Sequence, residues 1–330
     1  MKFGVIFGNP PFQKTDTRKK TQHKLWIDFT LKAVDEWLED GGHLSWITPS
    51  SWSSPSNKVL GLFKRNDVVS IDLDTKKHFP DIGSTFSNYH IIKGNNSITT
   101  SLTKKGAHFN FDFDDSLMYV PTDISQESLS IHKKVMFDTV DKLDVKHDYV
   151  TCHNVIRHAH KKNQEAIDKK LESIKKCTDI NKAEKVFESV KNLISKKKTI
   201  KITVSTTKTK DHKYPLLHTN RQTWYSSIKQ DFHDKPKVMW SRSGYTKPFY
   251  DDGQLGCTDM GCYILVDSQS AGECLSHNLN LNLFKYIFKT AKWSGFGNEL
   301  VFTSIPVVPT NRKMTDAEMY RQFSITPSEV

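Results

Sequence analysis

Apolar positions in the first hundred residues alternate between short unbroken runs and helical spacing. Residues 3–7 form an almost continuous apolar run, which is typical of a strand buried on both faces of a sheet. Apolar positions then recur at helical spacing over 24–39, and Gly41 and Gly42 follow where such a helix would end. Three more strands are predicted over 43–49, 68–73 and 88–93, with a helix over 59–63. This order predicts the later half of a doubly wound α/β sheet.

The rest of the chain combines helices with short strands. Lysine pairs and acidic residues are interspersed over 161–198, where apolar positions at helical spacing predict a helical hairpin with a break near 178–179. Gly, Pro and aromatic residues are frequent over 214–267, which is typical of short strands and turns. The other expected elements are an edge strand over 109–115, helices over 129–143 and 279–288, a strand over 199–206, and a helix that begins with a capping box formed by Thr315 and Glu318.

The first apolar run ends in a stiff turn that carries polar groups and an aromatic ring. Gly8 and two prolines interrupt the strand, so Asn9-Pro10-Pro11-Phe12 follows its carboxyl end, where open α/β sheets bind their ligands. The Asn9 amide and the Pro10 carbonyl can accept hydrogen bonds from an exocyclic NH2 group, and Phe12 can stack on a flat ring. The set fits an amine-bearing ring; a proline-rich turn that merely ends a core strand is the alternative.

Together with its preceding strand, this turn resembles the Asn-Pro-Pro-Phe/Tyr motif of amino-methyltransferases that use S-adenosylmethionine. The resemblance is strongest to adenine-N6 DNA methyltransferases of the type II and IIG restriction-modification kind, and it alone favours adenine over cytosine. The helix before Gly41-Gly42 and the strand ending in Thr48-Pro49 extend it over the N-terminal region. It implies a partial, Rossmann-like doubly wound methyltransferase sheet over residues 1–118. An α+β DNA target-recognition domain would follow over 119–330, with the Lys-rich helical insertion near 161–198.

The resemblance also implies roles for individual residues. Asn9, Pro10, Pro11 and Phe12 would be the catalytic residues of a methyl transfer to a flipped adenine. Phe79, in the loop before Pro80, matches the family position whose aromatic ring packs on the flipped base opposite the motif ring. An ordinary core position is the alternative for Phe79.

Charge and aromatic content are compatible with a nucleic-acid partner. The net charge is +11, which is the electrostatic pattern of a polyanion binder or of a lysine-rich solvated surface. We expect double-stranded DNA as the partner. Candidate DNA contacts outside the motif are Lys14, Arg18, Lys19, Lys20, Arg221, Trp224, Arg242 and Tyr245, of which none can be assigned to a base.

The sequence disfavours a membrane protein and a metal-binding protein. The chain has 330 residues, of which 36% are apolar. It contains no apolar run of about 18 residues and no signal-peptide pattern. We therefore expect a protein that is not bound to a membrane and lies in the cytoplasm of a bacterial or phage-infected cell. Five scattered cysteines give no pair of motifs at zinc spacing, so no metal site is expected.

One part of the family pattern is missing. The family binds S-adenosylmethionine on a glycine-rich turn that precedes the catalytic motif, but only eight residues precede Asn9. Gly295-Phe296-Gly297 lacks a preceding buried strand and an acidic residue at ribose distance, so it is rejected as a cofactor loop. We therefore expect the cofactor-binding half to be supplied by a partner subunit, or else a truncated chain or a degenerate one that keeps DNA binding.

Two other functions remain open. The chain could be a catalytically inactive DNA-binding specificity or decoy protein, or a methyltransferase acting on RNA or protein. The last is disfavoured because such enzymes rarely need about 200 residues of basic recognition region after the motif.

Overall fold

The computed structural model describes most of the chain. It leaves out residues 1, 13–23, 56, 82–84, 96, 148–154, 176, 178, 200–203, 220–221, 245, 294–295 and 298, and the side chains of 155–164, 194–199 and 296–297. Contacts divide the chain into two compact units. The first comprises Met1–Leu143, Asn278–Val308 and Met314–Val330, and the second Asp144–His277 and Pro309–Lys313.

The two units do not divide at the predicted boundary between residues 118 and 119. Residues 119–143 and most of the C-terminal region belong to the first unit together with the N-terminal sheet. The functional division into a catalytic part over 1–118 and a recognition part over 119–330 stays a prediction.

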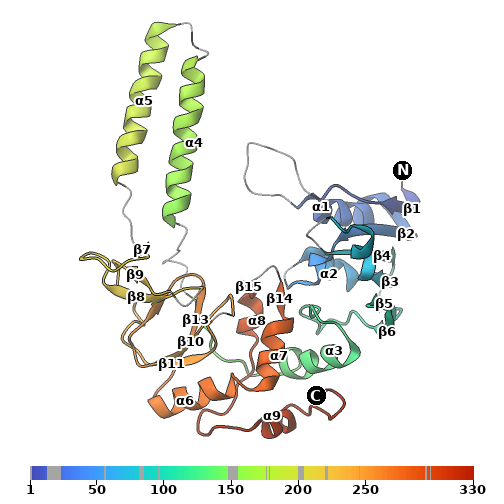
Figure 1. Ribbon diagram of the computed structural model, residues 1–330. Helices are drawn as coiled ribbons and strands as arrows, with labels where there is room; N and C mark the ends of the chain where they lie inside the picture. Colours follow the sequence, from blue (N-terminus) through green and yellow to red (C-terminus); the bar gives the residue numbers. More distant parts are fainter. Residues whose placement is uncertain are drawn as a thin grey trace. The chain divides into compact units, whose positions relative to one another are not determined.

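A six-stranded mixed sheet is the central element of the first unit (Figure 1). In the order β1-β2-β4-β3-β5-β6, its strands are β1 (Phe3–Gly8), β2 (Leu38–Pro49), β4 (Phe86–Ile92), β3 (Asp67–Asp72), β5 (Thr100–Lys104) and β6 (Ala107–Phe111). Strand β1 is parallel to β2 and β3 to β5, while β4 is antiparallel to both β2 and β3. The carboxyl ends of β1, β2, β3 and β5 therefore lie at one edge of the sheet. The mixed α/β class is confirmed; the partial, Rossmann-like arrangement stays a prediction.

Helices and short turns complete the first unit. They are α1 (Leu25–Lys32), α2 (Lys58–Phe63), α3 (Gln126–His132), α7 (Asn282–Thr290), α8 (Glu299–Thr303), α9 (Asp316–Gln322), π-helical turns Ala33–Trp37 and Lys133–Phe137, 3-10 turns Ser50–Ser53 and Asp74–His78, and the ribbon of β14 (Lys292–Trp293) and β15 (Phe296–Gly297). The core beside the sheet includes Trp26, Trp52 and Phe63, which are all fully buried. The predicted capping box at Thr315 and Glu318 is confirmed at the start of α9.

The prediction that the first strand is buried on both faces was wrong. Phe3, Val5 and Phe7 are 51%, 64% and 82% exposed, while Ile6 packs against the core. The reason is topological: β1 is the terminal strand in the sheet order and pairs only with β2 among the described strands. A run of apolar residues does not show whether both faces are covered within the same chain.

The predicted helix over residues 24–39 was too long. Helical structure ends at Trp37, and β2 begins at Leu38 and continues through Gly41 and Gly42. The Gly41 N–H donates to the Lys93 carbonyl and the Lys93 N–H donates to the Gly42 carbonyl, so pairing beside β4 holds this segment. The glycines therefore lie within a strand rather than capping a helix.

The second unit contains a helical hairpin and two small sheets. Helices α4 (Val155–Lys175) and α5 (Ile180–Thr199) lie side by side (Figure 1), as the Lys-rich pattern predicted. One sheet contains β11 (Phe249–Asp251), β10 (Lys237–Ser241) and β13 (Gly261–Leu265), and the other β12 (Gly256–Cys257), β8 (Tyr214–Leu217), β9 (Trp224–Ser226) and β7 (Val204–Ser205). Helix α6 (Gln269–Asn278) follows β13 and was not predicted.

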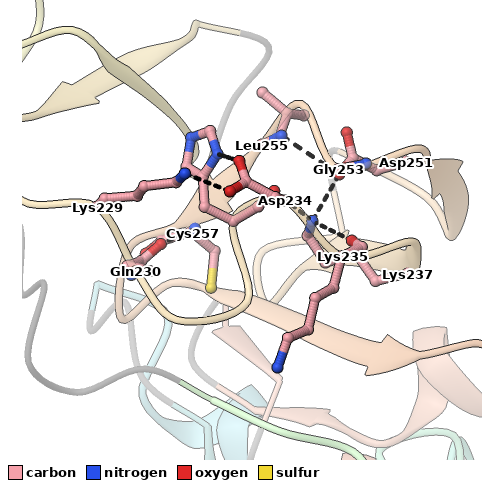
Figure 2. A network of polar contacts seen from close by, with 10 residues as sticks. Lys229, Gln230, Asp234, Lys235, Lys237, Asp251, Gly253, Leu255 and Cys257 are labelled. Atoms are coloured by element: carbon pink, nitrogen blue, oxygen red, sulfur yellow. Dashed lines mark hydrogen bonds and ion pairs between the residues drawn. The ribbon is translucent and has the colours of Figure 1, made fainter.

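A buried ion pair joins two strands of the first of these sheets. The Lys237 Nζ lies 2.7 Å from the Asp251 Oδ2, and both side chains are almost fully buried. The same ammonium donates to the Lys235 carbonyl at 2.8 Å, and the Asp251 carboxylate accepts from the Gly253 N–H at 3.1 Å and the Leu255 N–H at 3.3 Å (Figure 2). Backbone groups therefore satisfy both charges in addition to the pair itself.

Candidate functional site

The Asn-Pro-Pro-Phe turn lies at the edge of the sheet that contains the carboxyl ends of β1, β2, β3 and β5. Gly8, the last residue of β1, has a φ of +154°, which glycine adopts more readily than other residues. Beyond it Asn9 and Pro11 are exposed, Pro10 is buried and Phe12 is half-buried. The buried proline ring anchors the turn, and the Asn9 side chain is left open to a ligand.

Two predicted stacking rings meet on a third ring that the sequence did not single out. The Phe12 ring lies 5.2 Å from that of Phe86, and the Phe79 ring lies 5.0 Å from the same Phe86. Phe86 is 1% exposed, whereas Phe12 and Phe79 are half-buried. The structure therefore gathers Phe12 and Phe79 around one buried ring and leaves part of each accessible.

The loop that carries Phe79 is held by hydrogen bonds on both sides. The Lys76 Nζ donates to the Phe79 carbonyl at 2.9 Å, and the Asn88 N–H of β4 donates to the Thr75 hydroxyl at 3.0 Å. Asp74 accepts from the N–H groups of Lys105 and Gly106 in the turn between β5 and β6, and these backbone bonds lower the pKa of its carboxyl group. The loop is therefore tied to β4 and to the β5–β6 turn, which fixes the backbone position of Phe79.

Phe86 was missed because nothing in its local sequence marks it. It is the first residue of β4, and an aromatic residue there is equally typical of an ordinary core strand. The available signal was its position: β4 begins at the same edge where β1 ends, so its first side chain lies beside the motif.

The predicted DNA contacts outside the motif are only partly described. Lys14, Arg18, Lys19, Lys20, Arg221 and Tyr245 lie outside the described residues. In the second unit, Trp224 is half-buried with its ring 4.2 Å from that of His218. Arg242 is half-buried, and its Nη1 donates to the Asp259 carbonyl at 3.3 Å. Their role in DNA binding stays a prediction.

The described residues do not fit a complete binding site for S-adenosylmethionine. Strand β2 is followed by the serine turn Ser50–Ser53 and β3 by the Asp74–His78 turn, so neither leads through a glycine-rich turn into a helix. Phe296 and Gly297, from the rejected glycine pair, lie in a two-residue strand that pairs with β14. In the part of the chain that the structure describes, no turn of this type follows β2 or β3.

The described residues contain neither a metal-binding cluster nor a membrane-spanning helix. Among the described residues, no cluster of three or more His, Cys, Asp and Glu side chains is arranged to hold a metal ion. The same residues include no helix that is both long enough and apolar enough to cross a membrane.

Comparison with known proteins shows what the N-terminal region is similar to. Residues 1–95, which include β1 to β4, the motif and Phe79, match the family of Eco57I restriction-modification methylases. The chain is also 28% identical over 159 residues to an uncharacterized adenine-specific methylase of Mycoplasma pneumoniae. That match covers 44% of this chain and 37% of the relative, so the chain spans less than half of the relative's length. The similarity is to methyltransferases of the restriction-modification type.

Solved structures of restriction-modification enzymes resemble the chain more loosely. A nuclease-deletion mutant of the Type ISP enzyme LlaGI, in complex with a DNA substrate mimic, has a TM-score of 0.49 at 11% identity, over 92% of this chain and 40% of that one. The Type ISP enzyme LlaBIII bound to DNA has a TM-score of 0.45 at 10% identity, over 93% of this chain and 28% of that one.

Proposed function

We propose that this chain is the part of an adenine-N6 DNA methyltransferase that binds the target base and the DNA. The observation that carries the proposal is the exposed Asn9 amide after β1, in the same turn as Phe12, whose half-buried ring packs with that of Phe79 on Phe86. It is supported by the match of residues 1–95 to restriction-modification methylases.

The residues fit the acceptor side of a methyl transfer. The Asn9 side-chain oxygen and the Pro10 carbonyl would accept hydrogen bonds from the adenine N6 amine and so direct its lone pair outward. Phe12 and Phe79 would contact the faces of a base that has lost its stacking neighbours in the duplex. Positioning of this kind supplies much of a bimolecular reaction's acceleration, and it needs neither a metal nor a general base with a shifted pKa.

We further propose that a strand-bearing segment which binds the methyl donor, S-adenosylmethionine, covers β1. The support is the exposed apolar face of Phe3, Val5 and Phe7 on a strand with one free hydrogen-bonding edge among the described residues. Soluble proteins normally cover or charge such an edge. A partner subunit that adds strands beside β1 would both cover the edge and bring the donor to Asn9.

The proposal is tested by substitution of the motif amide. Asn9→Ala should reduce transfer of a labelled methyl group to DNA below detection, in the presence of the partner that supplies the donor site. DNA affinity, measured by fluorescence anisotropy at fixed salt, should remain within about twofold, since one uncharged side chain contributes little to the phosphate-dominated affinity. Asn95→Ala, at an exposed residue in the loop after β4, is the matched control. Equal transfer by the Asn9 and Asn95 variants would refute the assignment.

A second function is favoured by the absence of a donor turn among the described residues: a DNA-binding specificity protein without its own activity. Calorimetric titration with S-adenosylmethionine separates the two. Binding and methyl transfer that appear only when a second gene product is added support the split enzyme. DNA binding without transfer under any combination supports the inactive protein.

A further inference from the structure

A second concave site lies at the same edge of the sheet as the Asn-Pro-Pro-Phe turn. A cavity of about 260 Å³ is bordered by the Ser50–Ser53 turn that follows β2, by Leu73 after β3 and by Thr85 before β4. The Ser50 N–H donates to the Thr85 carbonyl at 3.0 Å, which closes this side of the cavity. Thr85 directly precedes Phe86, the ring on which Phe12 and Phe79 meet, so the cavity adjoins the proposed base site.

The cavity lining has the chemistry of an anion site. Lys104, Lys292 and the hydroxyl groups of Ser50 and Ser51 line it, and none of its lining residues is an Asp or Glu. The Lys104 Nζ donates to the Thr122 carbonyl at 2.6 Å, which leaves two of the three ammonium hydrogens for a ligand. Lysine and hydroxyl side chains are common donors to phosphate oxygens in DNA complexes.

The opposite wall is formed by the segment from Val120 to Thr122 and by Trp293. The Val120 N–H donates to the Ser53 carbonyl at 2.8 Å, and the Trp293 indole N–H donates to the Ser53 hydroxyl at 3.2 Å. The Thr122 N–H donates to the Thr290 carbonyl at 2.7 Å. Because these bonds connect the serine turn to the end of α7, the cavity is formed in the absence of a ligand, and binding would cost little ordering entropy.

The size of the cavity limits what it can hold. Pockets that enclose a drug-sized ligand have volumes of about 300–1,000 Å³. At about 260 Å³, this cavity is suited to a fragment of a nucleotide, such as a phosphate with its sugar. The Trp293 ring gives the sugar an apolar surface, while the lysines lie in the same lining for the phosphate.

We propose that this cavity binds a phosphodiester and sugar of the methylated DNA strand, at a nucleotide that neighbours the flipped adenine. The inference rests on the proposed function, because it places the strand relative to Asn9 and Phe12. Contacts to the DNA backbone beside the base site would hold the strand in position while the target base leaves the stack.

The test compares lysines that line the cavity with neighbours that do not. The full chain is titrated with fluorescein-labelled duplex DNA at several salt concentrations. Lys104→Gln and Lys292→Gln should each make the negative slope of log K against log salt less steep by about 0.9, the value for one lost phosphate contact. Lys105→Gln and Lys289→Gln are the matched controls, since both side chains are exposed and outside the lining. Circular dichroism verifies that each variant is folded.

The possible outcomes separate this inference from the proposed function. Unchanged slopes for both lining variants, with salt-dependent binding by the unaltered chain, would overturn the cavity assignment alone. Absence of DNA binding by the unaltered chain would overturn both. Calorimetric titration with dAMP provides a second arm. If Lys104→Gln weakens dAMP binding but leaves the salt slope for duplex DNA unchanged, the cavity takes a free nucleotide and the DNA assignment is overturned. If Lys104→Gln reduces both, the DNA assignment is supported.

Discussion

Among single residues, the buried charges of the second unit make the sharpest stability prediction. Lys237→Met removes the cation from beside Asp251 and leaves a carboxylate that is 4% exposed without its charged partner. Breaking a buried pair in this way costs about 3–5 kcal/mol of unfolding free energy. The two backbone N–H groups that remain on Asp251 place the expected loss near the lower value. Urea unfolding followed by tryptophan fluorescence measures it.

A matched control lies in the same network. Lys229 pairs with Asp234, and both side chains are about half exposed or more, so solvent screens the pair (Figure 2). Lys229→Met should therefore leave the urea midpoint close to that of the unaltered chain. If the two variants shift the urea midpoint equally, burial is not the reason that the Lys237–Asp251 pair contributes to the unfolding free energy.

The sequence was informative about residues whose chemistry is local and uninformative about those defined by packing. Asn9 and Phe12 were identified because prolines after an apolar strand restrict the backbone in a recognisable way. Phe86 and Lys104 reach the same edge of the sheet only through the pairing of β4 with β2 and of β5 with β3. No spacing along the chain encodes that proximity.

Among the elements, α3 and α7 are joined by a chain of buried hydrogen bonds that depends on pH. The Tyr119 hydroxyl and the His132 Nδ1 lie 2.8 Å apart, and the His132 Nε2 lies 2.8 Å from the Thr290 hydroxyl. Burial lowers the pKa of His132 to about 3, from an ordinary value of 6.5. The folded protein therefore holds a neutral imidazole where the unfolded chain takes up a proton.

This shift predicts a loss of stability in acid. The contribution of neutral His132 is fully present above about pH 6.5 and declines as the pH falls toward 3, because only the unfolded state gains the proton in that range. The slope attributable to one such group is about 1.4 kcal/mol per pH unit. Urea unfolding between pH 7.5 and 5 measures it, with His132→Asn and the exposed His108→Asn compared at each pH. The steepness should be smaller in His132→Asn alone; equal slopes in both variants would contradict the prediction.

Element boundaries were predicted well where local signals agree with long-range pairing. Strands β3 and β4 and helices α2, α4 and α5 lie close to where the apolar pattern placed them. The helix predicted over 129–143 ends at Phe137 in a π-helical turn, and β5 was not foreseen because it is stabilised by pairing with β3 and β6. The secondary structure of such segments depends on hydrogen bonds to segments distant in the sequence. The local pattern of residues does not show these bonds.

In the whole molecule, the region that is similar to known methylases is shorter than the compact unit that contains it. The family match covers residues 1–95, whereas the first unit also includes 278–308 and 314–330. The Trp293 indole N–H donates to the Ser53 hydroxyl and so joins the matched region to the C-terminal segment. The bond from Thr122 to Thr290 joins the same segment to the residues that follow the matched region. Folding of the matched region is therefore expected to depend on the C-terminal segment, although the sequence pattern treats them as separate parts.

The exposed face of β1 has a consequence for the isolated chain in solution. Phe3, Val5 and Phe7 form an apolar strip on a strand with an open edge among the described residues, and such edges promote association of copies. Val5→Thr/Phe7→Thr keeps residues that favour strands but removes most of the strip. Sedimentation velocity should show less self-association for this double variant than for the unaltered chain. Its unfolding free energy should change by about 0.5 kcal/mol or less per site, because both side chains are mainly exposed.

The control lies outside this strip, and the link to function uses the same double variant. Val140→Thr replaces an isolated side chain that is 89% exposed, and its sedimentation should match that of the unaltered chain. If β1 binds the donor-supplying segment, the double variant should also lose the activity that a partner restores, while its DNA affinity is retained. A double variant that still self-associates and is still restored by the partner would show that the strip is not the covered surface. The donor site would then have to approach Asn9 from another side of the sheet edge.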